Sequence, residues 1–298
     1  MKKQMKRLML GLMLLGTGVL AGCGNTDTAE EQNTADGKTI EEYVQEAKES
    51  LETADSFSAD FKNVLYDDSG AFTLDTKVIW VKDPLNIKVD TYGVDEKGGT
   101  QHSVTYLERG EGDAVNLYMN TDGGQWTEMT MTEENALDTV LSNNALEHMR
   151  VLLSAAEDWK LTGDAKGDLV TATAVIPEEK VYAVEEGGKF FWVSGMIGLP
   201  QTHYQGVGDM PLTFVFQRRT GEPVSYELDM AKALETVTNN ILRELDGGKL
   251  EDAMTVSAYT VSCNITQLNG VKAEPIPAGG KNNAINYEKE ISLLQNVE

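Results

Sequence analysis

The sequence predicts an antiparallel α+β domain, and two observations support this fold class. Between residues 56 and 131, short segments rich in β-branched and aromatic residues follow one another, separated only by turn clusters. Segments with apolar residues at helical spacing interrupt this series but do not alternate with it. Because parallel neighbours need a crossover of about a dozen residues or more, such short connections indicate antiparallel strands. The chain is therefore expected to form a long β-meander rather than βαβ units.

The predicted elements begin with a helix at residues 39–51. Thr39 stands three residues before Glu42, as in a capping box, and the following apolar residues form one stripe. Further helices are predicted over 132–158, from Pro177 onward, where Gly187 and Gly188 would break the helix, and near 230–245. The tail after Pro277 fits either a short helix or a frayed end. The predicted strands are 56–66, 71–81, 85–92, 102–108, 114–120, 125–131, 159–164, 168–176, 212–218, 223–230 and 255–268.

The first 22 residues have the features of an export signal. Four basic side chains precede Leu8, and residues 8–20 are apolar or small. A basic start before about 7–15 apolar residues is typical of a secretory signal, whereas a spanning helix needs about 20 apolar residues. Residues 20–23, LAGC, resemble the bacterial lipobox, in which cleavage precedes an acylated cysteine. We expect Cys23 to be the lipidated first residue of the mature protein; the alternative is an ordinary cleavage site, with Cys23 an incidental thiol.

A short tether is expected to follow the anchor. Residues 24–38 contain no aliphatic side chain larger than alanine, so this segment cannot bury enough surface to fold. With Cys23 it predicts a flexible acidic tether over residues 23–38. Residues 39–298 show no internal repeat and no second linker of this composition, which favours one domain.

The charge balance excludes some classes of partner. The chain has 25 basic and 48 acidic residues, a formal net charge of −23. Such a surface is repelled by nucleic acid and by anionic lipid head groups, so the acyl chains would have to hold the protein at the membrane. If Cys23 is lipidated, Cys263 has no partner for a disulfide. A buried, inert thiol is then the expected state of Cys263, with a reactive thiol as the alternative.

Several phrases in this sequence resemble a family of exported lipoproteins. They are residues 80–85 (WVKDPL), 118–126 across a glycine turn, 264–265 before 276–277, and 220–223 (TGEP). Together with the signal, tether and meander, they resemble lipoproteins with a half-open β-barrel, the fold of the periplasmic lipoprotein carrier and of mycobacterial glycolipid carriers, and uncharacterised Gram-positive lipoproteins of this type. The resemblance implies a curved antiparallel sheet with helices covering the concave side, and a cavity that binds a lipid or acyl chain.

One apolar segment is the main candidate for the mouth of such a cavity. Residues 189–200, KFFWVSGMIGLP, depart from the family pattern and group large apolar side chains with glycines that disfavour a regular helix. We expect this segment to border the cavity, and the tryptophans of two predicted strands are further candidates for ligand contact. The alternative is that all these side chains fill the core. The candidate ligand-binding residues are Trp80, Trp126, Phe190, Phe191, Trp192 and Met196.

The sequence carries no pattern typical of catalysis or of a metal site. His102, His148 and His203 are far apart and have no zinc-binding spacing. Ser194 lacks the preceding glycine of a nucleophile elbow, and no phosphate-binding glycine loop is present. A partial match to a calcium loop has Tyr118 at the first ligand position, so a hairpin turn explains it better. No catalytic residue, metal or cofactor is therefore expected.

Two functions remain open from the sequence. The first is a non-catalytic lipoprotein that binds a hydrophobic ligand in a half-barrel cavity. It would be anchored on the extracytoplasmic face of the cell membrane, at a Gram-positive cell surface. The second is a surface interaction or sensor lipoprotein with a packed core, whose acidic surface binds a protein or cationic partner. An apolar cavity of several hundred Å³ would favour the first, and a solid interior would favour the second.

Overall fold

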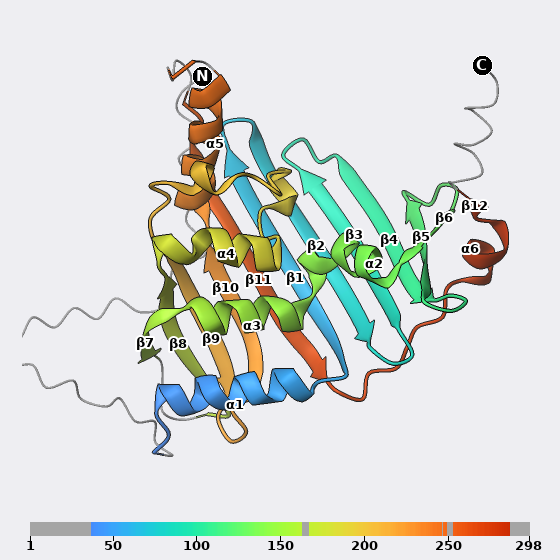
Figure 1. Cartoon of the computed structure of the whole chain (residues 1–298), viewed down its shortest axis with the longest axis horizontal. Coiled ribbons are helices and arrows are strands. Elements are labelled where there is room, and N and C mark those ends of the chain that lie inside the picture. Colours follow the sequence, from blue (N-terminus) through green and yellow to red (C-terminus); the bar gives the residue numbers. More distant parts are fainter. Residues whose placement is uncertain (1–36, 163–166, 246, 249–252, 287–298) are drawn as a thin grey trace, which may run out of the picture. The chain divides into compact units, whose positions relative to one another are not determined.

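Figure 1 shows a large β-sheet with helices packed on one of its faces. This computed structural model describes residues 37–162, 167–245, 247–248 and 253–286, all of which belong to one compact unit. Cys23, the expected signal and most of the expected tether lie outside the described residues. Within the described part of the chain, no helix has the length and apolar character needed to cross a membrane.

The sheet has twelve strands in the order β12-β6-β5-β4-β3-β2-β1-β11-β10-β9-β8-β7. All neighbours are antiparallel except β12 and β6, and β12 and β7 form the two edges, so the sheet is not closed. The predicted antiparallel α+β class is confirmed. The strands are β1 (Ser56–Asp67), β2 (Gly70–Val81), β3 (Asn86–Asp95), β4 (Thr100–Arg109), β5 (Ala114–Thr121), β6 (Thr127–Thr132), β7 (Glu157–Thr162), β8 (Leu169–Ile176), β9 (Met210–Gln217), β10 (Pro223–Asp229), β11 (Val256–Leu268) and β12 (Ile285–Asn286).

Strand β11 joins two meanders into one sheet. Strands β1 to β6 form one series of neighbours and β7 to β10 form another, as the short connections predicted. β11 lies between β1 and β10, and its pairing with β1 extends from Phe57 opposite Leu268 to Asp67 opposite Val256. The last long strand therefore joins β1 to β10, two strands that are more than 150 residues apart in sequence.

The helices α1 to α5 lie on one face of the sheet, which we call the inner face; the opposite face is the outer face. The capping box of the first helix is confirmed: Thr39 Oγ1 accepts a hydrogen bond from Glu42 N, and Thr39 N donates to the Glu42 carboxylate. Figure 1 shows the helices α1, α3 and α4 crossing the strands β7 to β11. The helices are α1 (Ile40–Thr53), α2 (Glu133–Thr139), α3 (Ala145–Ala155), α4 (Glu178–Gly188), α5 (Ala231–Leu245) and α6 (Ala278–Asn283), with 3₁₀ turns η1 (Leu141–Asn143), η2 (Trp192–Ser194) and η3 (Gln201–Tyr204).

Two helix predictions were wrong in their boundaries. The single helix predicted over 132–158 is divided into α2, η1 and α3, because the Asn144 side chain accepts a hydrogen bond from Glu147 N and so begins a new helix. Pro177 is the N-cap of α4 rather than its first residue. α4 ends at Gly188, and Lys189 then has left-handed backbone geometry with φ of 53°.

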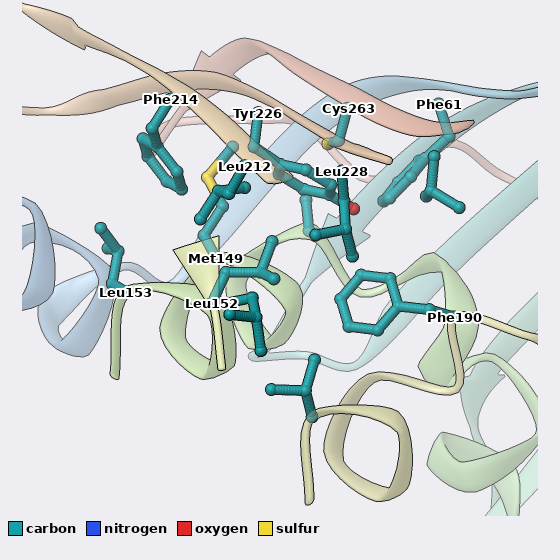
Figure 2. Packing of buried hydrophobic residues seen from close by; sticks show 14 of the residues in the cluster. Phe61, Met149, Leu152, Leu153, Phe190, Leu212, Phe214, Tyr226, Leu228 and Cys263 are labelled. Atoms are coloured by element: carbon teal, nitrogen blue, oxygen red, sulfur yellow. The ribbon is translucent and has the colours of Figure 1, made fainter. Parts of the chain in front are cut away.

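A closely packed core fills the space between α1, α3 and α4 and the strands β1 and β8 to β11. Its largest fully buried side chains include Tyr43, Phe57, Phe214, Tyr226 and Tyr259. Figure 2 shows Phe190 pointing into this layer, and its ring lies 6.4 Å from that of Tyr226. This part of the interior is solid.

The C-terminal segment covers part of the outer face. Ile276 packs on Tyr106 and Tyr118, side chains of β4 and β5 that point away from the helices. Ile285 N donates a hydrogen bond to Trp126 O, and β12 adds a short parallel strand beside β6. Of the two alternatives for the tail, a short helix or a frayed end, the structure shows the helix: residues up to Asn286 form α6 and then the edge strand β12.

Candidate ligand-binding groove

A half-open groove of about 430 Å³ lies on the inner face, beside the solid part of the core. We call it the inner groove. The strands β2 to β5 form its floor, the segment from the end of α2 to η1 forms one wall, and η2 forms the other. Its lining residues are Phe72, Leu74, Val89, Thr91, Gln101, Ser103, Thr105 and Met119 from the sheet, Thr139, Val140, Ser142 and Asn143 from α2 and η1, and Trp192 and Val193 from η2.

The strand register explains why these side chains share one face. Val89 pairs with Thr105 and Thr91 pairs with Ser103, so residues two apart on each strand point into the same groove. Gly93 stands opposite Leu74 and has no side chain to fill the floor. A Cβ atom at Gly93 would come within 3.2 Å of Leu74 and 3.1 Å of Phe72, because both of these side chains extend over the glycine.

The lining of the inner groove is apolar with a set of neutral hydroxyl and amide groups. Thr91, Ser103 and Thr105 form a polar strip on the floor, between the apolar side chains of the walls and strand ends. None of the described residues that line the groove has an ionisable side chain. An uncharged lining suits a hydrocarbon ligand, because a charged group beside it would lose hydration without a partner.

The wall that carries Trp192 is held by hydrogen bonds to buried groups. The Glu185 carboxylate accepts a hydrogen bond from Phe191 N at 3.0 Å, and the Tyr259 hydroxyl donates to Phe190 O at 2.5 Å. Ser194 Oγ donates to Phe191 O at 2.7 Å. Burial raises the pKa of Glu185 to about 8, although the amide groups of Phe191 and Phe190 favour its charged form.

The candidate residues within the segment 189–200 lie in different surroundings in the structure. Trp192 lines the inner groove. Phe190 and Phe191 are fully buried in the core, where Phe191 stacks on Tyr204. Met196 is partly buried against the core, and Thr238 Oγ1 donates a hydrogen bond to its sulfur at 3.4 Å.

Trp80 of β2 and Trp126, which directly precedes β6, lie away from the inner groove. Trp80 is buried and stacks on Phe57, with ring centroids 5.6 Å apart. Trp126 packs on Tyr106 and against Gly280, under the C-terminal segment on the outer face. The six candidates therefore do not form one site: the segment 190–196 is brought together, and Trp192 alone among them lines the groove.

Sequence reasoning missed the floor of the groove. In β4 the inward positions are Gln101, Ser103, Thr105 and Leu107, so the inner face changes from polar to apolar along one strand. A run of hydroxyl residues in the inward phase of an otherwise apolar strand was the signal that could have identified the floor. Large aromatic side chains are the more conspicuous signal in this sequence, and most of them pack in the core or under the C-terminal segment.

The three histidines lie in different surroundings. His148 is buried, its Nδ1 is 2.6 Å from the Tyr226 hydroxyl, and burial lowers its pKa to about 4. His102 of β4 pairs with Asp90 of β3. His203 of η3 pairs with Glu244 of α5. Among the described residues, no three His, Cys, Asp or Glu side chains converge as metal ligands. Cys263 is buried in β11, and burial raises the pKa of its thiol.

Comparison with solved structures finds a similar fold in two mycobacterial lipoproteins. Lipoprotein LppX of Mycobacterium tuberculosis has 12% sequence identity and a TM-score of 0.40, and the match covers 79% of this chain and 96% of that chain. LprF of Mycobacterium bovis has 13% identity and a TM-score of 0.43, with 80% and 96% covered. No protein-family model and no curated protein matches the sequence.

Proposed function

We propose that this protein is a membrane-anchored cell-envelope lipoprotein that binds a lipid or acyl chain in the inner groove and catalyses no reaction. The inner groove is the observation that carries this proposal. It has a volume of about 430 Å³, within the range of about 300–1,000 Å³ that is usual for small-molecule sites. Its uncharged lining, open on one side, suits a hydrocarbon chain.

The anchor and location come from the sequence. The basic and apolar signal followed by LAGC supports acylation of Cys23 and retention on the extracytoplasmic face of a membrane. Two or more acyl chains suffice for stable anchoring, whereas a single chain is marginal. The strong negative charge argues against nucleic acid as a partner.

Quenching of Trp192 fluorescence by a brominated fatty acid tests binding in the inner groove. The probe is dibromostearate, added to the full-length chain that carries Cys23→Ser, so that no acyl anchor competes. We expect quenching that saturates and that disappears in Trp192→Phe. Trp126→Phe is the matched control, because Trp126 lies outside the groove and should leave the saturable quenching in place. Absence of saturable quenching would contradict lipid binding at this site.

A second candidate function rests on the solid half of the interior. Under α3 and α4, side chains such as Phe190, Tyr226 and Leu228 are buried completely and pack against one another in the core. If the inner groove binds no lipid, the protein would act through its surface, as an interaction or sensor lipoprotein. A protein or cationic partner recovered by crosslinking on intact cells, with no lipid bound, would favour this second function.

A further inference from the structure

We propose that the outer face carries a second binding site, which takes a neutral, hydroxyl-rich glycan chain. The site is a groove of about 690 Å³ that crosses five adjacent strands, β2, β1, β11, β10 and β9. Its volume is in the range of small-molecule sites. The sheet itself separates this outer groove from the inner groove, and the two grooves share no lining residue.

The polar side chains of the outer groove form two parallel rows across the strands. In one row Lys62 pairs with Asp75 on one side and with Ser262 on the other, and Ser262 also pairs with Glu227. In the next row Asp60 stands between Lys77 and Asn264. At the usual strand spacing of about 4.8 Å, five strands span about 19 Å from first to last. The groove is therefore long enough for an extended chain.

The charged groups of these rows are available to a ligand. Opposite charges stand directly across the β1–β2 pair, where such side chains commonly interact. Nevertheless, Asp60, Lys62, Asp75, Lys77 and Glu227 are exposed, and none of them forms an ion pair with any described residue. Donor and acceptor groups thus alternate from strand to strand and face solvent.

This alternation selects among ligand chemistries. Three carboxylates stand beside two ammonium groups. The carboxylates would repel a polyanion, and the lysines would repel a polycation. A hydrocarbon chain laid along these rows would strip water from the lysine and carboxylate groups of the lining without offering them a partner. A sugar hydroxyl both donates and accepts a hydrogen bond, so neighbouring hydroxyls satisfy a carboxylate and an ammonium or amide group together. A neutral glycan is the chain whose groups match both rows.

Isothermal titration calorimetry with neutral oligosaccharides tests the outer site. The protein is the full-length chain with Cys23→Ser, and the probes are cellohexaose, maltohexaose and chitohexaose, with hexalysine as a cationic comparison. Ser262→Trp fills the centre of the groove with a bulky side chain. Ser257→Trp is the matched control, because Ser257 is an exposed position of the same strand outside the groove.

We expect at least one oligosaccharide to bind, Ser262→Trp to weaken its binding at least tenfold, and Ser257→Trp to leave it unchanged. The double variant Lys62→Met with Asp75→Val gives a second test that adds no bulk, and it should also weaken binding. No binding of any of the three oligosaccharides would overturn the proposal. Equal losses in Ser262→Trp and Ser257→Trp, or tighter binding of hexalysine than of the oligosaccharides, would also overturn it.

Discussion

The carboxylate of Glu185 accepts a hydrogen bond from the backbone nitrogen of Phe191, and both residues are buried. This bond joins the last turns of α4 to the segment that carries Trp192 into the inner groove. The Glu185 Oε1 atom has no hydrogen-bond partner among the described residues, and the nearby Tyr204 hydroxyl has none either. A protonated carboxyl is the less costly state in such surroundings.

The first prediction concerns the pH dependence of stability. The pKa of Glu185 is about 8 in the folded protein and 4.5 in its ordinary state, so the folded state binds the extra proton between these values. Stability is therefore lost as pH rises towards and through 8, by up to about 1.4 kcal/mol per pH unit. His148, with a pKa of about 4 against 6.5, has the opposite effect below pH 6.5.

Urea denaturation at several pH values checks this prediction. Between about pH 7.5 and 8.5, a full pH unit or more above the ordinary pKa of His148, we expect the free energy of unfolding to fall in the wild type. Glu185→Gln keeps an oxygen that accepts from Phe191 N but has no proton to lose, so its curve should be flat over this range. Equal slopes in the two proteins would show that Glu185 is not the group responsible.

The second prediction concerns Gly188, where α4 ends. A Cβ atom at this position would collide with the ring of Phe190, which is fully buried. We expect Gly188→Ala to destabilise the protein by about 1–3 kcal/mol, the usual cost of overpacking a core. Gly279→Ala is the control, because a Cβ there meets no atom within 4 Å. Thermal unfolding of both variants measures the difference, and an unchanged Gly188→Ala would mean that the ring can move aside.

The sequence predicts those parts of the fold that depend on residues close together in the chain, and it fails for those that depend on distant residues. The strands β1 to β6 were predicted within a few residues, because alternation and turn residues are local signals. The place of β11 between β1 and β10 was not predicted, because it depends on pairings such as Phe61 with Cys263 across 200 residues. The break between α2 and α3 depends on one cap at Asn144, which the apolar spacing of 132–158 concealed.

The candidate site was predicted only in part, for a similar reason. Trp192 and Val193 of the segment 189–200 line the inner groove, whereas the Gly188 end of α4 and the hydrogen bond to Glu185 direct Phe190 and Phe191 into the core. Only the register of the finished sheet shows that Thr91, Ser103 and Thr105 face one groove. Composition cannot show which polar residues of a strand point inward.

The third prediction concerns the C-terminal segment. Lys88 pairs with Glu274 at 2.7 Å, and Ile276 covers Tyr106 and Tyr118. Removing residues 270–298 should expose these rings and the edge of β6, and an uncovered strand edge favours association. We expect the truncated protein to dimerise or aggregate in size-exclusion chromatography with light scattering. Lys88→Met, which removes the charge contacts of Lys88 with Glu274, Asp90 and the Tyr106 ring but leaves the segment in place, is the milder control. A monomeric truncated protein would contradict a covering role for this segment.

The fourth prediction concerns the anchor. Cys23→Ser removes the only residue of the LAGC motif that can be acylated, so the protein should be released from the membrane fraction into the medium or the soluble fraction. Cys263→Ser is the matched control, since Cys263 is buried and should not affect retention. Immunoblots of both fractions measure the distribution. Retention of Cys23→Ser at the membrane would show that another part of the chain holds it there.

The central claim is that the inner groove holds a lipid, and mass spectrometry of co-purified lipids tests it most directly. The full-length Cys23→Ser chain is compared with Thr91→Trp, which fills the groove floor, and with Thr73→Trp, which lies outside the groove. We predict a stoichiometric lipid with the parent and with Thr73→Trp, and at least a fivefold loss in Thr91→Trp. A parent protein that carries no lipid, or equal lipid in Thr91→Trp, would contradict the account.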